Sequence, residues 1–232
     1  MRHRVIKSVV AAAVVAAFTI SAQGKLLVTE FIADPYGTDA DREWIEIFNS
    51  GDTAMSLDGY KVGDEETKLG TESMWSFPAG TMMAAGQVYV ICQKTTGFFD
   101  YYGRNPDFEI SETDAGVPNM TKYTAWASGS LALAQAGDHA LIVGPDDTIV
   151  DAVNYGDATM FFTGAALGPY QSYERANALI DTDTAADWIV RLSNDTTPSH
   201  SDATPGFVTI PEPSAMALGL LAAALFVARR RV

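Results

Sequence analysis

The chain has 232 residues, with 15 lysines and arginines against 29 aspartates and glutamates, giving a formal net charge of −14. So acidic a chain is a poor candidate for nucleic-acid binding, because its surface repels phosphates. Cys92 is the single cysteine, which excludes an intramolecular disulfide.

The first 24 residues have the three parts of a secretory signal peptide. Arg2, Arg4 and Lys7 form a positive start, an apolar run follows at 9–20, and small residues suited to cleavage follow at 21–24. We therefore expect the Sec translocon and signal peptidase to process this end. The remainder of the chain is predicted to be exported across the inner membrane.

Residues 25–192 are predicted to form one β domain. Short runs of strand-forming residues alternate with turns rich in Gly, Pro, Asn and Asp, and no span shows a sustained helical period. The predicted strands are 26–32, 43–49, 56–62, 75–78, 88–92, 130–133, 140–143, 149–155, 172–175 and 188–190. Many short strands with regular turns indicate an all-β fold, an antiparallel β-sandwich.

An insertion at about 95–124 interrupts this rhythm and is predicted as a surface excursion with one short strand. It carries four neighbouring aromatic residues, Phe98, Phe99, Tyr101 and Tyr102. Exposed aromatic faces stack on sugar rings or anchor protein interfaces, so these residues are candidate ligand contacts. The alternative is that they pack against the sandwich.

The strand at 43–49 alternates strictly between two faces. Trp44 and Phe48 share one face and are expected to fill the space between two sheets. Glu46 lies between them and would be costly to bury without a partner. It is expected either to be buried against Arg175, Lys61 or backbone amides, or to face solvent at a sheet edge.

Four acidic residues, Asp34, Asp39, Asp41 and Glu43, gather on one loop and the start of the next strand. Such oxygen-rich loops suit Ca²⁺. The spacing does not fit an EF-hand, since the turn glycine and the distal glutamate are missing. Ca²⁺ is therefore one alternative, and a solvated acidic loop without any cofactor is the other.

Catalytic motifs are absent from the sequence. The exported region holds only His139 and His200, and it contains no nucleophile elbow, zinc motif or phosphate-binding glycine loop. We expect a protein that is not an enzyme. A secreted hydrolase that uses acidic residues remains the alternative.

The C-terminal part reads as a stalk followed by a membrane-directed tail. Residues 193–209 are rich in Ser, Thr, Asp and Pro and are predicted to be flexible. An apolar run at 215–228 then precedes three terminal arginines, which favour the cytoplasmic side. A helix over this run would reach about 21 Å, short of the ~30 Å hydrocarbon core. This length favours a processed tail over a permanent anchor, and both alternatives stay open.

The tail at 210–232 resembles the PEP-CTERM sorting signal of bacterial envelope proteins. The resemblance is carried by Pro211, Glu212 and Pro213, the apolar run, and Arg229, Arg230 and Arg231. It implies recognition by an exosortase-type membrane protease. The protein would be a transient membrane-anchored intermediate and would then reach the cell envelope or extracellular matrix.

The β domain resembles a bacterial lamin-tail domain over roughly residues 25–191. The segments that carry the resemblance are 27–31, 43–49, 57–60, 77–81, 150–156 and 172–175. It implies an immunoglobulin-like β-sandwich that serves as an accessory or adhesive module, and it transfers no catalytic residues. The expected function is a non-enzymatic binding or structural module, with exopolysaccharide or other surface proteins as partners. A Ca²⁺-dependent adhesion or carbohydrate-binding module is the alternative.

Overall fold

The computed structural model describes residues 25–191 and 202–211. The predicted signal peptide, the apolar run 215–228 and the residues Glu212, Pro213, Arg229, Arg230 and Arg231 lie outside the described residues, whereas Pro211 is described and exposed. Within the described ranges, no helix is both long and apolar enough to cross a membrane.

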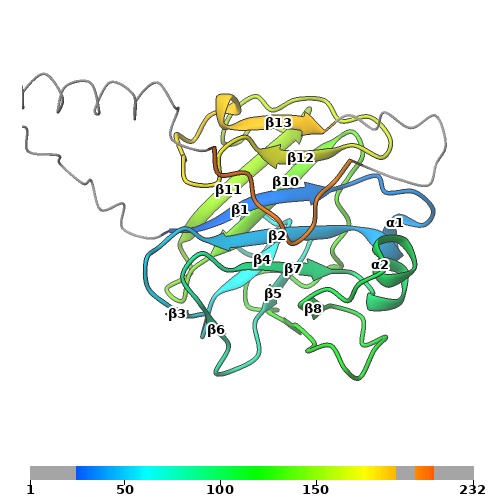
Figure 1. Ribbon diagram of the computed structural model, residues 1–232, viewed down its shortest axis with the longest axis vertical. Helices are drawn as coiled ribbons and strands as arrows, with labels where there is room; N and C mark the ends of the chain where they lie inside the picture. The colour runs from blue at the N-terminus through cyan, green and yellow to red at the C-terminus, as the bar shows by residue number, and fades with distance from the viewer. Residues whose placement is uncertain (1–24, 192–201, 212–232) are drawn as a thin grey trace, which may run out of the picture.

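The fold consists of two β-sheets packed face to face (Figure 1). The six-stranded sheet contains, in spatial order, β13 (Trp188–Arg191), β12 (Ser172–Arg175), β1 (Leu26–Ile32), β2 (Trp44–Asn49), β7 (Val88–Cys92) and β8 (Phe108–Glu109). The five-stranded sheet contains β11 (Ile149–Gly156), β10 (Gly137–Val143), β4 (Lys61–Gly63), β5 (Met74–Ser76) and β9 (Thr121–Lys122). The short strands β3 (Met55–Ser56) and β6 (Met82–Met83) pair separately. Among these strand pairs only β7 and β8 run parallel, and the predicted immunoglobulin-like sandwich is confirmed.

The main core fills the space between the sheets. Phe31 and Tyr155 meet there with ring centroids 4.9 Å apart, and Ile47 of β2 is buried beside them in the same cluster. Trp44 instead belongs to a second cluster, on the outer face of the six-stranded sheet. The prediction that Trp44 and Phe48 fill the space between the sheets is therefore wrong. The alternation was correct, but both faces of β2 are buried, so alternation alone could not tell which face meets the other sheet.

The helix α2 (Thr95–Tyr102) covers this outer cluster. Its Phe98 is fully buried and meets Trp44 edge to face, with ring centroids 6.5 Å apart. The insertion thus holds a helix and two short strands, β8 and β9, where the sequence predicted one strand and no helix. Eight residues form only two helical turns, too few for a helical period to stand out.

The predicted strand 130–133 is not a strand in the structure. Its backbone amides bind acidic side chains from other elements instead of a neighbouring strand. Ala132 donates to Asp64 Oδ2 at 2.8 Å, and Ala134 donates to Asp138 Oδ2 at 2.8 Å. These bonds hold residues 131–135 across one end of the sandwich.

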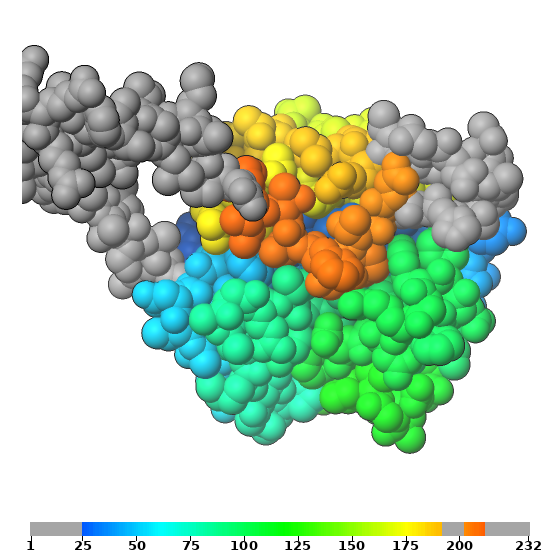
Figure 2. Space-filling view, in the orientation of Figure 1, coloured from blue at the N-terminus to red at the C-terminus, as the bar shows by residue number. Residues whose placement is uncertain are grey.

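Residues 202–210, which we call the strap, lie across the outer face of the six-stranded sheet (Figure 1, Figure 2). Gly206 N donates to Glu46 Oε2 at 2.6 Å, and Pro205 is buried. The flexible stalk predicted for 193–209 is therefore wrong for its described part. Glu46 is fully buried and has a backbone amide as partner, which was one of the predicted alternatives. The solvent-facing alternative is wrong, because β2 is an interior strand.

Candidate functional site

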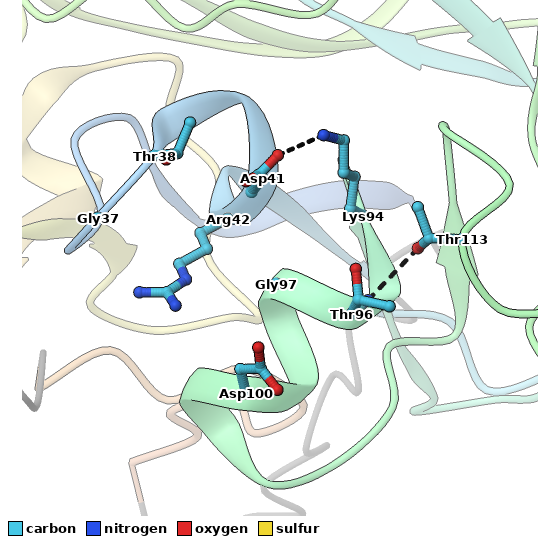
Figure 3. A pocket seen from close by; sticks show the side chains of 9 residues that line it. All are labelled: Gly37, Thr38, Asp41, Arg42, Lys94, Thr96, Gly97, Asp100 and Thr113. Atoms are coloured by element: carbon cyan, nitrogen blue, oxygen red, sulfur yellow. Dashed lines mark hydrogen bonds and ion pairs between the residues drawn. The ribbon is translucent and has the colours of Figure 1, made fainter.

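A polar pocket of about 410 Å³ lies between α1 (Asp39–Arg42) and α2 (Figure 3). Its walls come from the loop before α1, from both helices and from one residue of the loop after β8. The lining residues are Gly37, Thr38, Asp41, Arg42, Lys94, Thr96, Gly97, Asp100 and Thr113. We call this the α1–α2 pocket.

Two glycines stand at close contacts in the pocket wall, and one of them lies where the two helices meet. A Cβ atom at Gly97 would lie 2.4 Å from the carbonyl oxygen of Asp41, so only glycine fits where α2 meets α1. Gly37 has φ +101°, and a Cβ there would lie 2.7 Å from Arg42 Nη1. A larger residue at either position would push the walls of the pocket apart.

Charges of both signs line the pocket. Lys94 forms an ion pair with Asp41 across its floor, and Arg42 Nη1 donates to the carbonyl oxygen of Tyr36 at 2.6 Å. Asp100 adds an exposed carboxylate from α2. Carboxylates accept hydrogen bonds from hydroxyl groups, while guanidinium and ammonium groups donate to them. The pocket therefore suits a ligand with many hydroxyl groups.

Three tyrosine rings stand outside the lining of the pocket but next to its Arg42, and we call Tyr36, Tyr101 and Tyr170 the tyrosine rim. The Tyr36 ring lies 6.5 Å from that of Tyr101 and 5.8 Å from that of Tyr170. The Arg42 guanidinium carbon lies 5.9 Å from the Tyr36 ring and 5.7 Å from the Tyr101 ring, so both rings contact the same charge. Tyr36 is 39% exposed, so part of the residue is accessible to a ligand.

The four aromatic residues singled out in the sequence have different environments. Phe98 is buried under α2, and Tyr102 accepts a hydrogen bond from Trp44 Nε1 at 3.0 Å. Phe99 is 49% exposed and lines a second pocket of about 340 Å³, which shares Thr96 and Asp100 with the first. Tyr101 alone of the four lies at the tyrosine rim. The sequence left exposure and packing open for these four residues, and the structure packs Phe98, which removes it from the set of candidate ligand contacts.

The acidic residues predicted to bind Ca²⁺ do not converge. Asp41 is paired with Lys94, and Asp39 Oδ2 accepts from Gln135 Nε2 at 3.1 Å. Glu43 is buried, accepts from Gln93 Nε2 at 3.2 Å, and burial raises its pKa to about 8. The closest carboxylate clusters among the described residues do not include Asp34 or any other member of this set. The prediction assumed that acidic residues close in sequence would surround one cation, but Asp39, Asp41 and Glu43 each contact a different partner.

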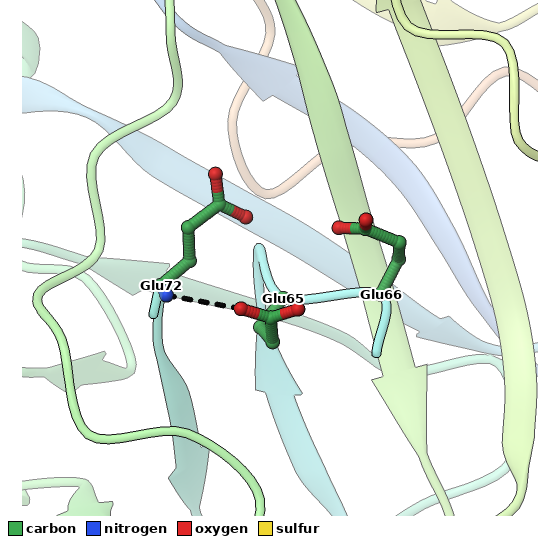
Figure 4. Close-up of side chains that lie close together, drawn as sticks. All are labelled: Glu65, Glu66 and Glu72. Carbon is green, nitrogen blue, oxygen red and sulfur yellow. Dashed lines mark hydrogen bonds between the residues drawn. The ribbon is translucent and has the colours of Figure 1, made fainter. Parts of the chain in front are cut away.

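A different acidic cluster has the closeness that a cation needs. Glu65, Glu66 and Glu72 lie in the loop between β4 and β5, and each offers an oxygen within 4.8 Å of the others (Figure 4). Burial, followed by the charges of Asp138 and the other nearby carboxylates, raises the pKa of Glu72 to about 7. His139 Nδ1 lies 3.3 Å from Glu66 Oε2 and supplies a partner for one of the three carboxylates.

A further acidic group is already neutralised by cations. Asp151, Asp181 and Asp183 offer oxygens close enough for an ion. The fully buried Arg175 lies 3.0 Å from Asp151 and 3.3 Å from Asp181, however. Lys25 also pairs with Asp181 at 3.0 Å. This group is a structural ion network, and no local pattern indicated it, because its members come from separate strands and loops.

Sequence reasoning also missed the polar half of the α1–α2 pocket. Arg42, Lys94 and Asp100 stand in segments that were interpreted as an acidic loop and an aromatic insertion. The available signal was the single basic residue inside the acidic run at 39–43. A cation among carboxylates needs an explanation, and here it faces the pocket.

Comparison with known proteins places the fold. The described sandwich resembles the crystal structure of a DUF4876 family protein from Bacteroides thetaiotaomicron VPI-5482, with a TM-score of 0.51 and 12% identity over 82% of this chain and 73% of that one. This likeness concerns the fold alone. No curated protein matches the sequence. The family described as Lamin Tail Domain matches residues 19–157, which is more than half of the chain. The chain is therefore a member of the lamin tail domain family.

Proposed function

We propose that this protein is an exported, non-enzymatic binding module of the bacterial cell envelope whose α1–α2 pocket holds a polyhydroxylated ligand, with exopolysaccharide as the ligand class. The observation that carries the proposal is the combination of Asp41, Arg42, Lys94 and Asp100 with a tyrosine rim. Immunoglobulin-like domains of this family serve as structural modules, and the pocket gives this one a surface for binding.

The chemistry of the pocket matches a sugar in two ways. Hydroxyl groups can exchange their hydrogen bonds with water for bonds to paired carboxylate and guanidinium groups. The apolar face of a sugar ring can cover the exposed face of Tyr36 or Tyr101. Because the pocket is open to solvent, it can accept an internal sugar unit of a polymer while the rest of the polysaccharide extends into solvent.

The test is a titration of the full chain with the purified extracellular polysaccharide of its host. Tyr101→Ala and Arg42→Gln are each expected to weaken binding about 10-fold, since an aromatic contact and a charged hydrogen bond each contribute on the order of 1 kcal/mol. Phe207→Ala removes an exposed aromatic from the strap, outside the pocket, and should leave binding unchanged. Equal binding by the two pocket variants and the wild type would place the ligand elsewhere.

The route to the envelope is also part of the proposal. The first 24 residues would direct export, and the tail at 210–232 would be cut by an exosortase-type protease after transient anchoring in the inner membrane. Intact-mass measurement of the protein from envelope and medium tests this. A species that starts near Lys25 and ends near Pro211 supports cleavage. A membrane-bound species that retains Arg229–Val232 would establish a permanent anchor.

A Ca²⁺-dependent module is the second candidate, supported by the cluster of Glu65, Glu66 and Glu72. Calcium at ten times its dissociation constant would stabilise the protein by about 1.4 kcal/mol. Melting in Ca²⁺ and in chelator should then differ by a few degrees, and the double variant Glu66→Gln and Glu72→Gln should abolish the difference. Asp39→Asn is the control, since it belongs to the acidic loop that does not converge. Equal melting of the wild type in both conditions excludes this candidate.

A further inference from the structure

Three buried glutamates form a row across the outer face of the six-stranded sheet. Glu30 of β1 is the register partner of Glu46 on β2 and of Glu174 on β12. A β-bulge between Val28 and Glu30 sets this alignment. All three side chains are at most 2% exposed. Carboxylates buried in adjacent strands repel one another and lose their hydration, so they persist only with partners.

Each glutamate is held in place by its own sheet. Thr29 Oγ1 donates to Glu46 Oε1 at 2.6 Å, and Ser172 Oγ donates to Glu30 Oε1 at 2.5 Å. Arg191 of β13 forms an ion pair with Glu174. In each carboxylate one oxygen is thereby fixed by the sheet, which leaves oxygens free to accept a hydrogen bond from a bound segment.

The strap supplies the missing donors, one for each glutamate. The Thr204 amide donates to Glu30 Oε2 at 3.0 Å, the Gly206 amide to Glu46 Oε2 at 2.6 Å, and Thr209 Oγ1 to Glu174 Oε1 at 2.6 Å. In a fourth bond the strap is the acceptor: the amide of the buried Ala178 donates to the carbonyl oxygen of Thr209 at 2.9 Å. The strap therefore matches the row along its length.

The fit of the strap also depends on shape. Gly206 has φ +87°, so any side chain here would strain the backbone, and a Cβ would also displace the Arg104 guanidinium, whose Nη1 would lie 2.3 Å away. Pro205 before it is buried, and Ala203 packs against the outer cluster around Trp44. Phe207 is 70% exposed and takes no part in the contact. Figure 2 shows the strap as a narrow strip between the parts of the domain contributed by residues before 130 and after 170.

We propose that this outer face is a binding site for an extended peptide with donors at every second or third residue, and that the chain fills it with its own residues 202–210. The start of the C-terminal tail is thereby fixed on the domain, since Pro211 follows the strap directly. A segment that reaches the row in place of the strap would free the tail. This site is separate from the α1–α2 pocket, and its failure would leave the proposed function untouched.

Hydrogen exchange of the full chain in detergent micelles, followed by mass spectrometry, tests the proposal. The amides of Thr204 and Gly206 in the strap, and that of Ala178 in the body, should be protected at least about 10-fold relative to an unstructured peptide. The combined variant Thr204→Ala, Gly206→Ala and Thr209→Ala should remove this protection, Ala178 included. Phe207→Ala is the matched control in the same segment and should retain it. Peptides from β10 and β11 should exchange as in the wild type in both variants, which shows that the sandwich is folded.

Two results would overturn the proposal. The first is exchange of wild-type residues 202–210 at the rate of an unstructured peptide, which would mean that the row does not bind the strap. The second is protection found only in a dimeric fraction, measured by light scattering, with free exchange in the monomer. The row would then bind the strap of a second copy, and the assignment to the same chain would be wrong.

Discussion

The two faces of the six-stranded sheet both bury charge, and they do so in different ways. On the inner face, Arg175 meets Asp151 of the opposite sheet at 3.0 Å, inside the sandwich. On the outer face, Glu30 and Glu46 are covered by the strap, a segment more than 150 residues later in the chain. Burial is complete on both faces. The inner charge is paired within the strands of the sandwich, whereas the outer charges are covered by a segment that belongs to neither sheet.

The largest effect is expected on the inner face, from Arg175→Met. The substitution keeps most of the apolar volume but leaves Asp151 buried without its cation. Breaking a buried pair in this way costs about 3–5 kcal/mol, so we expect the melting temperature to fall by about 10 °C. Thermal melting followed by circular dichroism measures it.

Lys68→Met is the control for this prediction. Lys68 also pairs with an aspartate, Asp147, but its side chain is 50% exposed. Such surface pairs contribute less than about 1 kcal/mol. If both variants melt alike, the ion network on the inner face does not stabilise the fold as described.

A second prediction concerns pH, and it separates the buried carboxyl groups from ordinary ones. Burial raises the pKa of Glu30 to about 7 and that of Glu43 to about 8, from an ordinary value of 4.5. Between about pH 4.5 and 8 the folded protein therefore holds protons that the unfolded chain has released. The free energy of unfolding must fall as pH rises through this window. We expect the melting temperature to drop by about 5 °C or more from pH 5 to pH 8.

Neutral variants identify the groups responsible. Glu30→Gln and Glu43→Gln should each make the melting temperature less dependent on pH, because neither glutamine titrates. Glu112→Gln changes an exposed acid and should leave the slope as it is. A wild-type melting temperature that rises from pH 5 to pH 8 would contradict the raised pKa values.

A smaller effect is expected from Trp44→Phe on the outer face. The substitution keeps an aromatic ring against Phe98 but removes the hydrogen bond from Trp44 Nε1 to Tyr102. One lost hydrogen bond costs about 1 kcal/mol, or about 2–4 °C in melting temperature. Tyr102→Phe removes the same bond from the other side and should cost as much. If combining the two changes doubles the loss, each residue has a separate role.

The smallest effect is expected from displacing the strap, measured by the rate at which a thiol reagent labels Cys92 in the same outer cluster. Burial raises the pKa of this thiol and Phe98 covers it, so labelling should be about 1,000-fold slower than in the denatured chain. Displacing the strap through Gly206→Ala should raise the rate only a few-fold, because α2 still covers the thiol. Labelling at the denatured rate in that variant would show that strap and helix leave together.

Local pattern predicted the strands but not what covers them. The alternation at 43–49 predicted β2, and the turn signals predicted β10 and β11. The structure has a strand at each of these places. The sequence could not reveal α2, which is short, contains Gly97 and has no side-chain cap at Lys94. The strap was predicted to be flexible because the segment 193–209 is rich in Ser, Thr, Asp and Pro. Its order comes instead from Glu30 and Glu46, which no local pattern connects to it.

The candidate site was predictable only in part. Tyr101 and Asp41 were identified as candidate contacts, each for a different ligand, and the structure brings both to the α1–α2 pocket or its rim. What joins them is the close approach of α1 and α2 at Gly97, and such a contact has no sequence signal outside the fold.

The strap also determines how the domain would respond to mechanical tension. Lys25, at the start of β1, is tied to Asp181, and Thr209, at the end of the strap, is tied to Ala178, so both described ends meet the same short loop. A pull on Pro211 loads Thr209 first, then Gly206, then Thr204. The hydrogen bonds of the strap would therefore break one after another rather than all at once. The strap would thus detach at low force and lengthen the tether before the strands of the six-stranded sheet separate from one another.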